Sequence, residues 1–412
     1  MRLDLTDMLY ALSFALDSVE AELVGVNTGH GKRVAYLSLL MGKEAGYREE
    51  ELRDFIGCCL LHDNALTESI NDELSDKSAE NLSPDLLELC DMNKLERNHS
   101  VIGEDNIRLL PFRSDVKNVI LYHHENADGS GVFGKKASET PLKSQILHFA
   151  DIADTAKVFR PESMTKAEYD GLCEWVNGRK DIKFSGEVAE LFKKAVSFDK
   201  IAEIQEKGLE VCLHEELHKE IIDYPDETIR NIANLFTKIV DYKSEFTERH
   251  STGVAQKAEI MARYYGFDAE KSIRFYFAGA MHDIGKLAVS NNILEKPDKL
   301  TDEEFSAMKN HASATYYVLK QIKEIPDILE WASNHHEKLN GKGYPRGLSA
   351  EQLSFEDQLM ACVDIYQALT EKRPYKDGMS HEKSISIMLG MAERNELNEK
   401  IVRDMDALFA KG

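Results

Sequence analysis

The sequence AMHDIGK at residues 280–286, followed by His311 and by HHEKLNGKGYP at residues 335–345, is the stretch that decides the fold of this chain. Between residues 282 and 336 it carries five histidine and aspartate side chains that could bind metal. Imidazole and carboxylate groups are common ligands of divalent ions, and few other roles need so many of them close together. The stretch therefore indicates a metal site. The alternative is a set of unrelated surface or core histidines.

The first half of the chain carries the same series of residues, which argues against that alternative. The leading His precedes the His-Asp pair by 32 residues in both copies, and the His pair precedes the last Asp by 27 residues in one copy and 28 in the other. The first series is His30, His62, Asp63, His99, His123, His124 and Asp151, and the second is His250, His282, Asp283, His311, His335, His336 and Asp364. Seven potential ligands repeated in order predict two copies of one metal-binding domain.

Composition limits the classes of partner. The 412 residues are 42% hydrophobic and carry a formal net charge of -22, whereas polymeric nucleic acid and anionic membranes require a positive surface. We therefore expect neither as a partner. The six cysteines contain no CxxC pair, and no apolar run is long enough to span a membrane. These features predict a cytoplasmic protein with reduced thiols.

Apolar residues recur at helical spacing through both halves, and alternating β-branched runs are scarce. The predicted fold is all-α, with two tandem helical bundle domains. We expect the first domain at residues 1–205, a linker helix at 206–226 and the second domain at 227–412. The linker contains His214 and His218 at i, i+4 spacing, which could bind metal, but their charged neighbours favour a solvated helix.

The His-Asp doublet at 282–283 has a direct chemical interpretation. Adjacent residues of a helix point about 100° apart, so the carboxylate can bridge two ions while the imidazole binds one of them. Paired divalent ions activate water and neutralise charge on a phosphoryl group, which favours phosphoester hydrolysis. Ligands without thiolate suit iron, manganese, nickel or zinc, and the sequence does not choose among them.

The second half resembles the HD-GYP family of metal-dependent cyclic di-nucleotide phosphodiesterases, a branch of the HD hydrolases. The motifs that carry the resemblance are HDIGK at 282–286, HHEKLNGKGYP at 335–345 and ALTEKRPYK at 368–376. It implies an HD-type helical bundle with two or three metal ions, and hydrolysis of cyclic di-GMP to linear pGpG or GMP. The implied metal ligands are His250, His282, Asp283, His311, His335, His336 and Asp364. Asp283 and Lys286 would be catalytic, and Tyr344, Arg373 and Lys376 would bind substrate.

Two residues depart from the family pattern. Relatives with a third metal ion have Glu one turn before the first His, where this chain has Phe246, so two divalent ions are expected. Asn340 stands where Asp is common, which should change a loop hydrogen bond and not a ligand. Tyr344 and Pro345 have an alternative interpretation as a turn that merely shapes the loop.

The first copy keeps all seven ligand positions, which form a possible second metal site, but not the residues around them. Leu66 replaces Lys286, Val132 and Phe133 replace Tyr344 and Pro345, and Ser163 replaces Lys376, while Arg160 matches Arg373. Losing two ammonium groups removes electrostatic stabilisation of the reaction, which predicts a regulatory or scaffolding domain. A working HD hydrolase for another phosphate is the alternative.

The leading functional hypothesis is a phosphodiesterase acting on cyclic di-GMP or 3′3′-cyclic GMP-AMP in the second domain. One alternative is an HD phosphohydrolase acting on another nucleotide phosphoester. The other is a non-catalytic receptor for a cyclic di-nucleotide, and the retained Lys286, Tyr344, Arg373 and Lys376 argue against it. The base specificity, the regulatory input and the oligomeric state, with a homodimer as one option, are not readable from the sequence.

Overall fold

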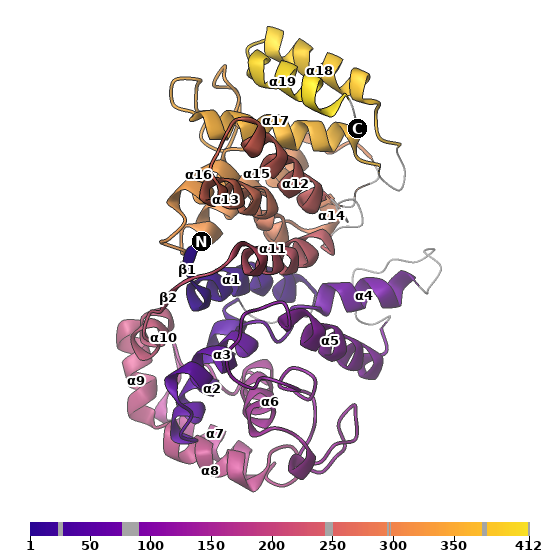
Figure 1. The fold of residues 1–412 in the computed structure, drawn as a ribbon. Coiled ribbons are helices and arrows are strands. Elements are labelled where there is room, and N and C mark those ends of the chain that lie inside the picture. The colour runs from indigo at the N-terminus through magenta and orange to yellow at the C-terminus, as the bar shows by residue number, and fades with distance from the viewer. Residues whose placement is uncertain are drawn as a thin grey trace. The chain divides into compact units, whose positions relative to one another are not determined.

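The computed structural model describes residues 1–23, 28–75, 90–243, 250–294, 296, 298–372 and 377–410, and its regular structure is almost entirely helical (Figure 1). The predicted all-α fold is confirmed. Within those ranges the only sheet pairs β1 (Arg2–Asp4) with β2 (Ile221–Asp223). None of the described helices is long and apolar enough to cross a membrane.

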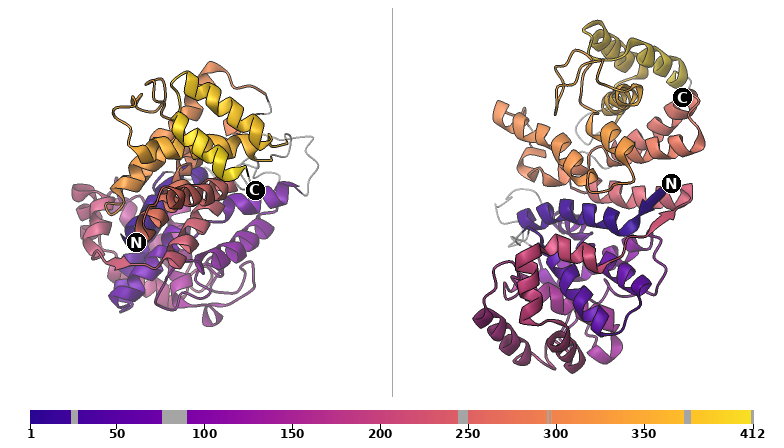
Figure 2. Two further views of the ribbon diagram at one scale, coloured as in Figure 1. Left: turned by 45° about the horizontal axis from the view of Figure 1, so that its top comes forward. Right: turned by 90° about the vertical axis from the view of Figure 1, so that its left-hand side faces the viewer.

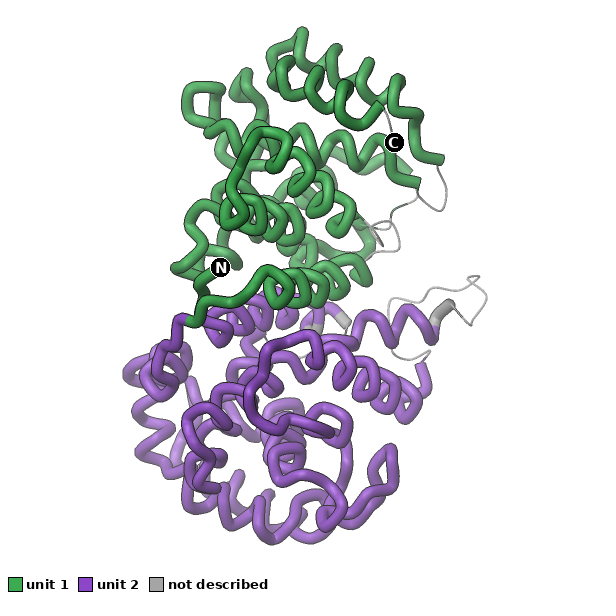
Figure 3. The backbone as a smooth tube through the Cα atoms, viewed as in Figure 1, with its two compact units in different colours: residues 1–3, 222–412 green, residues 4–221 purple. Residues whose placement is uncertain are grey.

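The chain forms two compact units (Figure 3). The N-terminal unit contains residues 4–221, and the C-terminal unit contains residues 1–3 and 222–412. The segment 206–226 is not the single linker helix that we expected. It holds α10 (Leu209–Glu216) and then β2, and it packs on the N-terminal unit because Cys212 and Leu213 are buried. The half-exposed His214 and the exposed His218 join no metal-type cluster among the described residues.

The N-terminal unit is built around helix α2 (His30–Glu44), whose residues from Val34 to Met41 are nearly all inaccessible to solvent. The side chains of α3, α6 and α8 pack around it. The other helices of this unit are α1 (Leu5–Leu23), α3 (Glu49–Leu60), α4 (Leu66–Ser75), α5 (Met92–Ile107), η2 (Ala137–Glu139), α6 (Leu142–Thr155), α7 (Lys166–Asn177), α8 (Gly186–Ala195) and α9 (Phe198–Lys207). A helix buried on all sides fixes the position of His30, its first residue.

The C-terminal unit repeats this plan with α12 (His250–Tyr264) packed between α13 and α17. The helices α18 and α19 lie side by side in each view (Figure 2). The elements are α11 (Asp226–Asp241), α13 (Ala269–Met281), η3 (Ile284–Ala288), α14 (Asn291–Leu294), α15 (Asp302–Leu319), α16 (Pro326–Ser333), α17 (Phe355–Thr370), α18 (His381–Glu393) and α19 (Glu399–Phe409).

Next to the His-Asp doublet two backbone segments approach closely, and the glycine that permits this contact lies at different positions in the two units. In the C-terminal unit η3 lies against α15, and a Cβ on Gly285 would lie 2.0 Å from the carbonyl oxygen of His311. The Gly285 N–H donates to Thr315 Oγ1 at 3.0 Å. In the N-terminal unit the equivalent pair is Ala65 and Gly103, so the glycine has moved to the facing helix. In both units the two backbones approach so closely that one of the two facing positions must be glycine.

Candidate metal centres

The predicted ligands of each unit lie at helix ends and on the helices around the central one. His250 begins α12 just as His30 begins α2, and the His-Asp doublets follow the helices α13 and α3. His311 lies in α15 and His99 in α5, the His pairs come after α16 and before α6, and the last aspartates lie in α17 and α6. Residues far apart in sequence are thereby brought to one point in each unit.

In the C-terminal unit Asp283 lies between two groups of histidines. Its Oδ2 is 3.1 Å from His282 Nε2 and 3.8 Å from His250 Nε2. Its Oδ1 is 3.5 Å from His311 Nε2 and 3.8 Å from His335 Nε2. Each carboxylate oxygen thus faces a different pair of imidazoles, which is the arrangement of a ligand that bridges two ions.

Asp364 joins the same two groups. Its Oδ1 is 3.1 Å from His250 Nε2 and 3.7 Å from His282 Nε2, and its Oδ2 is 3.7 Å from His336 Nδ1. Among the described residues of this unit, two clusters could hold an ion: His250 with His282 and Asp283, and His311 with His335 and His336. All seven predicted ligand residues of this unit therefore converge.

Backbone carbonyls orient the rings of the C-terminal unit. Nδ1 of His282, His311 and His335 each donates to the carbonyl three residues earlier, at 2.6 or 2.7 Å. Each Nε2 then carries a lone pair. The Nε2 atoms of His311 and His335 face each other at 3.4 Å, and the buried Nε2 of His282 has no hydrogen-bond partner among the described atoms. A divalent metal ion between these buried lone pairs would satisfy them, so this donor set fits such an ion.

The pKa values of several of these ligands match those of metal ligands, and His250 is the exception: burial lowers its pKa, but its hydrogen bonds to Asp364 and Glu371 raise it to about 9. Burial alone would raise the pKa of Asp283, but His282 and Lys286 lower it well below its usual range. Burial lowers the pKa of His336 to about 3 and that of His335 well below its usual value. Charged carboxylates and neutral imidazoles are the forms that coordinate metal.

The motif residues Lys286 and Tyr344 lie beside the cluster. Lys286 Nζ donates to Asp283 Oδ2 at 2.5 Å, and its side chain is 19% exposed. The Tyr344 ring lies 4.8 Å from the His336 ring. Arg373 and Lys376 lie outside the described residues, as does Phe246. The geometry of those three predictions is therefore not described.

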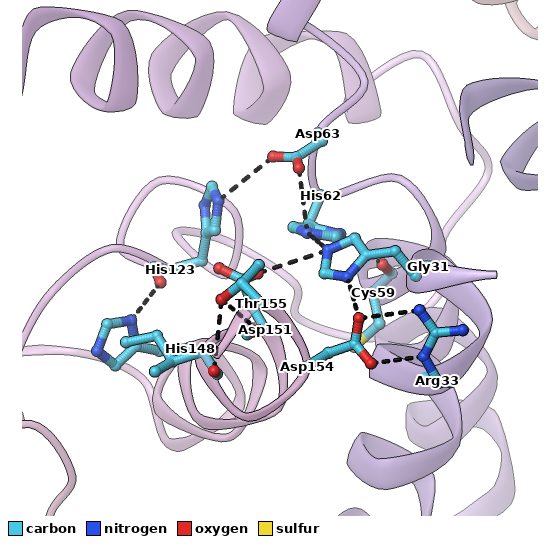
Figure 4. Close-up of polar contacts among 12 residues, drawn as sticks. Gly31, Arg33, Cys59, His62, Asp63, His123, His148, Asp151, Asp154 and Thr155 are labelled. Carbon is cyan, nitrogen blue, oxygen red and sulfur yellow. Dashed lines mark hydrogen bonds and ion pairs between the residues drawn. The ribbon is translucent and has the colours of Figure 1, made fainter. Parts of the chain in front are cut away.

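The N-terminal unit has the same carboxylate arrangement (Figure 4). Asp63 Oδ2 is 3.4 Å from His62 Nε2, whereas its Oδ1 is 3.4 Å from His99 Nε2 and 3.9 Å from His123 Nε2. Asp151 Oδ1 is 3.5 Å from His30 Nε2. The potential metal clusters are His30 with His62 and Asp63, and Asp63 with His99, His123 and His124.

The residues that hold the leading histidine were missed by sequence reasoning. In the N-terminal unit Asp154 accepts from His30 Nδ1 at 2.8 Å and from Arg33 Nε at 2.5 Å, and Arg160 donates to it as well. In the C-terminal unit Glu371 lies 2.9 Å from His250 Nδ1. These carboxylates do not align between the copies, so the repeat gave no signal for them.

Two further residues could have been found by aligning the copies. Glu337, the third residue of HHE, is no ligand: its carboxylate accepts backbone N–H groups of Arg346 at 2.7 Å and Leu348 at 2.9 Å and so anchors the following loop. Lys309, two residues before His311, lies 6.0 Å from the Tyr344 ring centroid. The N-terminal unit has Glu125 and Arg97 at the same positions, the latter stacked on Phe133.

Known proteins with related sequences support the division into two similar domains. HD domain profiles match residues 28–156 and residues 234–401. The 3′3′-cGAMP-specific phosphodiesterase 1 of Vibrio cholerae is 27% identical over 93% of this chain and 87% of its own length. The 3′3′-cGAMP-specific phosphodiesterase 3 of the same organism is 31% identical over 69% of this chain and 61% of its own length. The crystal structure of the V. cholerae cyclic GMP-AMP specific phosphodiesterase V-cGAP3 matches the fold with a TM-score of 0.65 at 23% identity, covering 99% of this chain and 98% of the other.

Proposed function

Because this chain belongs to the HD-GYP family of proteins with tandem HD domains, we propose that its C-terminal unit is a metal-dependent phosphodiesterase that hydrolyses a cyclic di-nucleotide. The substrates with most support are 3′3′-cGAMP and cyclic di-GMP, since the related proteins are named for these two compounds. The observation that carries the proposal is Asp283, whose two oxygens face separate histidine pairs and whose Oδ2 accepts from Lys286 at 2.5 Å.

We propose two divalent ions in this unit, drawn from iron, manganese, nickel and zinc. His250, His282 and Asp364 would hold one ion, His311, His335 and His336 the other, and Asp283 both. Such a pair supplies an activated water and neutralises charge on a phosphoryl group. The acidic chain, with a net charge of -22, needs this local positive charge to hold an anionic substrate.

The chain's own cations complete the site. Lys286 is oriented by its ion pair with Asp283 and would donate to a phosphoryl oxygen as negative charge develops there. Tyr344 and Lys309 lie next to each other beside the histidines and would contact the nucleotide. Arg373 and Lys376 would bind the second phosphate, for which a guanidinium fork and an ammonium group are suited.

The corresponding proposal for the N-terminal unit is metal binding without hydrolysis. Leu66, which is 5% exposed, occupies the position of Lys286, so among the described residues no ammonium group lies beside Asp63 in the way that Lys286 lies beside Asp283. An apolar side chain there provides no stabilisation of a developing negative charge.

The test is incubation of the purified full chain, loaded with manganese or iron, with 3′3′-cGAMP, cyclic di-GMP and a nucleotide monoester, followed by chromatography of the products. We expect a linear di-nucleotide or mononucleotide from at least one cyclic substrate. Tight binding of a cyclic di-nucleotide without product would instead identify a receptor. Cleavage of the monoester alone would identify a different HD phosphohydrolase.

A further inference from the structure

The N-terminal unit contains a cavity of about 640 Å³ directly over its potential metal ligands. His30, Asp63, His99, His124 and Asp151 form part of its lining. Its volume lies within the range of about 300–1,000 Å³ that small-molecule sites occupy. A domain with a purely structural role has no need of a cavity above its metal ligands.

Three basic side chains line this cavity, although alignment with the other copy predicts the loss of two cations. They are Lys157, Arg160 and Lys183. Arg160 is fixed in place, because its Nη2 donates to the backbone carbonyl of Asp154 at 2.8 Å. Neither lysine ammonium is held in an ion pair with a carboxylate within 4.0 Å in the described part of the chain, although the acidic Glu96 also lines the cavity and interacts electrostatically with Lys183.

Lys183 stands where the C-terminal unit has an acidic residue. The backbone carbonyl of Lys183 accepts from Ala127 N at 3.1 Å, and in the C-terminal unit that of Glu396 accepts from Leu339 N at 3.1 Å. The two positions are therefore equivalent, and the charge is reversed. Glu396 is neutralised by Lys338 and Arg394.

Lys157 is the second gained cation. It follows α6 with a φ of 59°, and its N–H donates to the Asp154 carbonyl at 2.8 Å. At the same distance after the last aspartate ligand, the C-terminal unit has Thr370. The N-terminal unit has thus lost the ammonium beside its bridging aspartate and gained two at other places around the cavity.

The rest of the lining gives the chemical class of the ligand. Leu66, Met92, Val132 and Ile152 supply apolar surface, and the basic residues supply an anion site next to metal ligands. Apolar surface beside cations suits a molecule that has both a flat ring and a phosphate. We propose that the N-terminal unit binds a nucleotide, with its phosphate held by Lys157 and Lys183, and does not hydrolyse it. This proposal does not rest on the reaction proposed for the C-terminal unit.

The test is calorimetric titration of the full, manganese-loaded chain with 5′-GMP, cyclic di-GMP, guanosine and inorganic phosphate. The chain carries Asp283→Ala so that turnover in the C-terminal unit does not interfere. In this background we compare two double variants. The cavity variant carries both Lys157→Asn and Lys183→Gln, and the control variant carries both Lys166→Gln and Lys193→Gln. The control variant removes the same charge from exposed lysines of the same unit, and Asn tolerates the positive φ at 157.

We expect at least one of the two nucleotides to bind, and its Kd to rise about tenfold in the cavity variant and to stay the same in the control. Guanosine and inorganic phosphate should each bind far more weakly. Equal nucleotide affinity in the two variants would overturn the role of the lysines. Binding of guanosine or of phosphate alone as tightly as the nucleotide, or no binding of either nucleotide, would overturn the assigned ligand.

Discussion

Replacing Lys286 with Leu would give the C-terminal unit the residue that the N-terminal unit already has at the equivalent position. The Lys286 ammonium group, which this substitution removes, lies 2.5 Å from Asp283 Oδ2 and is within reach of any phosphoryl group at the bridging carboxylate. A unit charge about 4.5 Å from a developing charge contributes about 3.7 kcal/mol at an effective dielectric constant of about 20. Measured losses of a single stabilising donor are about 2.7–4 kcal/mol. The expected fall in kcat is therefore about 10²- to 10³-fold.

The metal content should stay the same, because Lys286 is not a ligand and Asp283 keeps its histidine neighbours. Turnover of the cyclic di-nucleotide is measured by chromatography, and bound metal by elemental analysis of the same sample. Lys296→Leu is a matched control, since Lys296 is a similarly half-buried lysine that pairs with Glu304. If Lys286→Leu kept the kcat of the parent, Lys286 would be only a partner of Asp283 and the electrostatic argument would be wrong.

Three other predictions test other parts of the site. Asp283→Ala should release metal from the C-terminal unit and abolish turnover, because both histidine groups share this carboxylate; unchanged metal stoichiometry with full activity would disprove the assignment. Asp63→Ala should lower the metal content of the N-terminal unit and its thermal stability while kcat stays within about threefold, and a loss of kcat as large as that of Asp283→Ala would show that the N-terminal unit takes part in the reaction. Glu337→Gln should weaken the anchor of the loop that carries Tyr344 and lower kcat/KM about tenfold. Both Glu337→Gln and Glu125→Gln should lower the free energy of unfolding by about 1–3 kcal/mol, but Glu125→Gln should leave turnover unchanged.

The ligand residues could be predicted from sequence because a metal site depends on residue type and order, and both are repeated here. His282, Asp283 and Asp364 are recognisable as donors without coordinates. The neighbours that orient these donors follow no such rule. Glu371 and Asp154 both hold the leading histidine of their unit, yet they come from non-equivalent positions, because any carboxylate that reaches Nδ1 serves.

The charge around the N-terminal cavity was also beyond sequence reasoning. Alignment of the two copies identifies the residues that replace functional ones, such as Leu66 in place of Lys286. Residues that have gained a charge at other positions cannot be recognised in this way. Lys183 reaches the cavity only because backbone bonds hold its loop to residues 127 and 128, which is a tertiary contact.

The two units show which part of such a site the fold itself requires. The ligands form a buried set in which each imidazole and carboxylate depends on the others, so removing one leaves the rest buried without partners. Selection for folding alone therefore opposes their loss. Leu66 and Lys286 are under no such constraint, because Leu66 is accommodated beside the same histidines at 5% exposure. Cations can consequently appear and disappear around a fixed ligand frame, and their positions, more than the ligands, distinguish the unit proposed to hydrolyse its ligand from the unit proposed only to bind one.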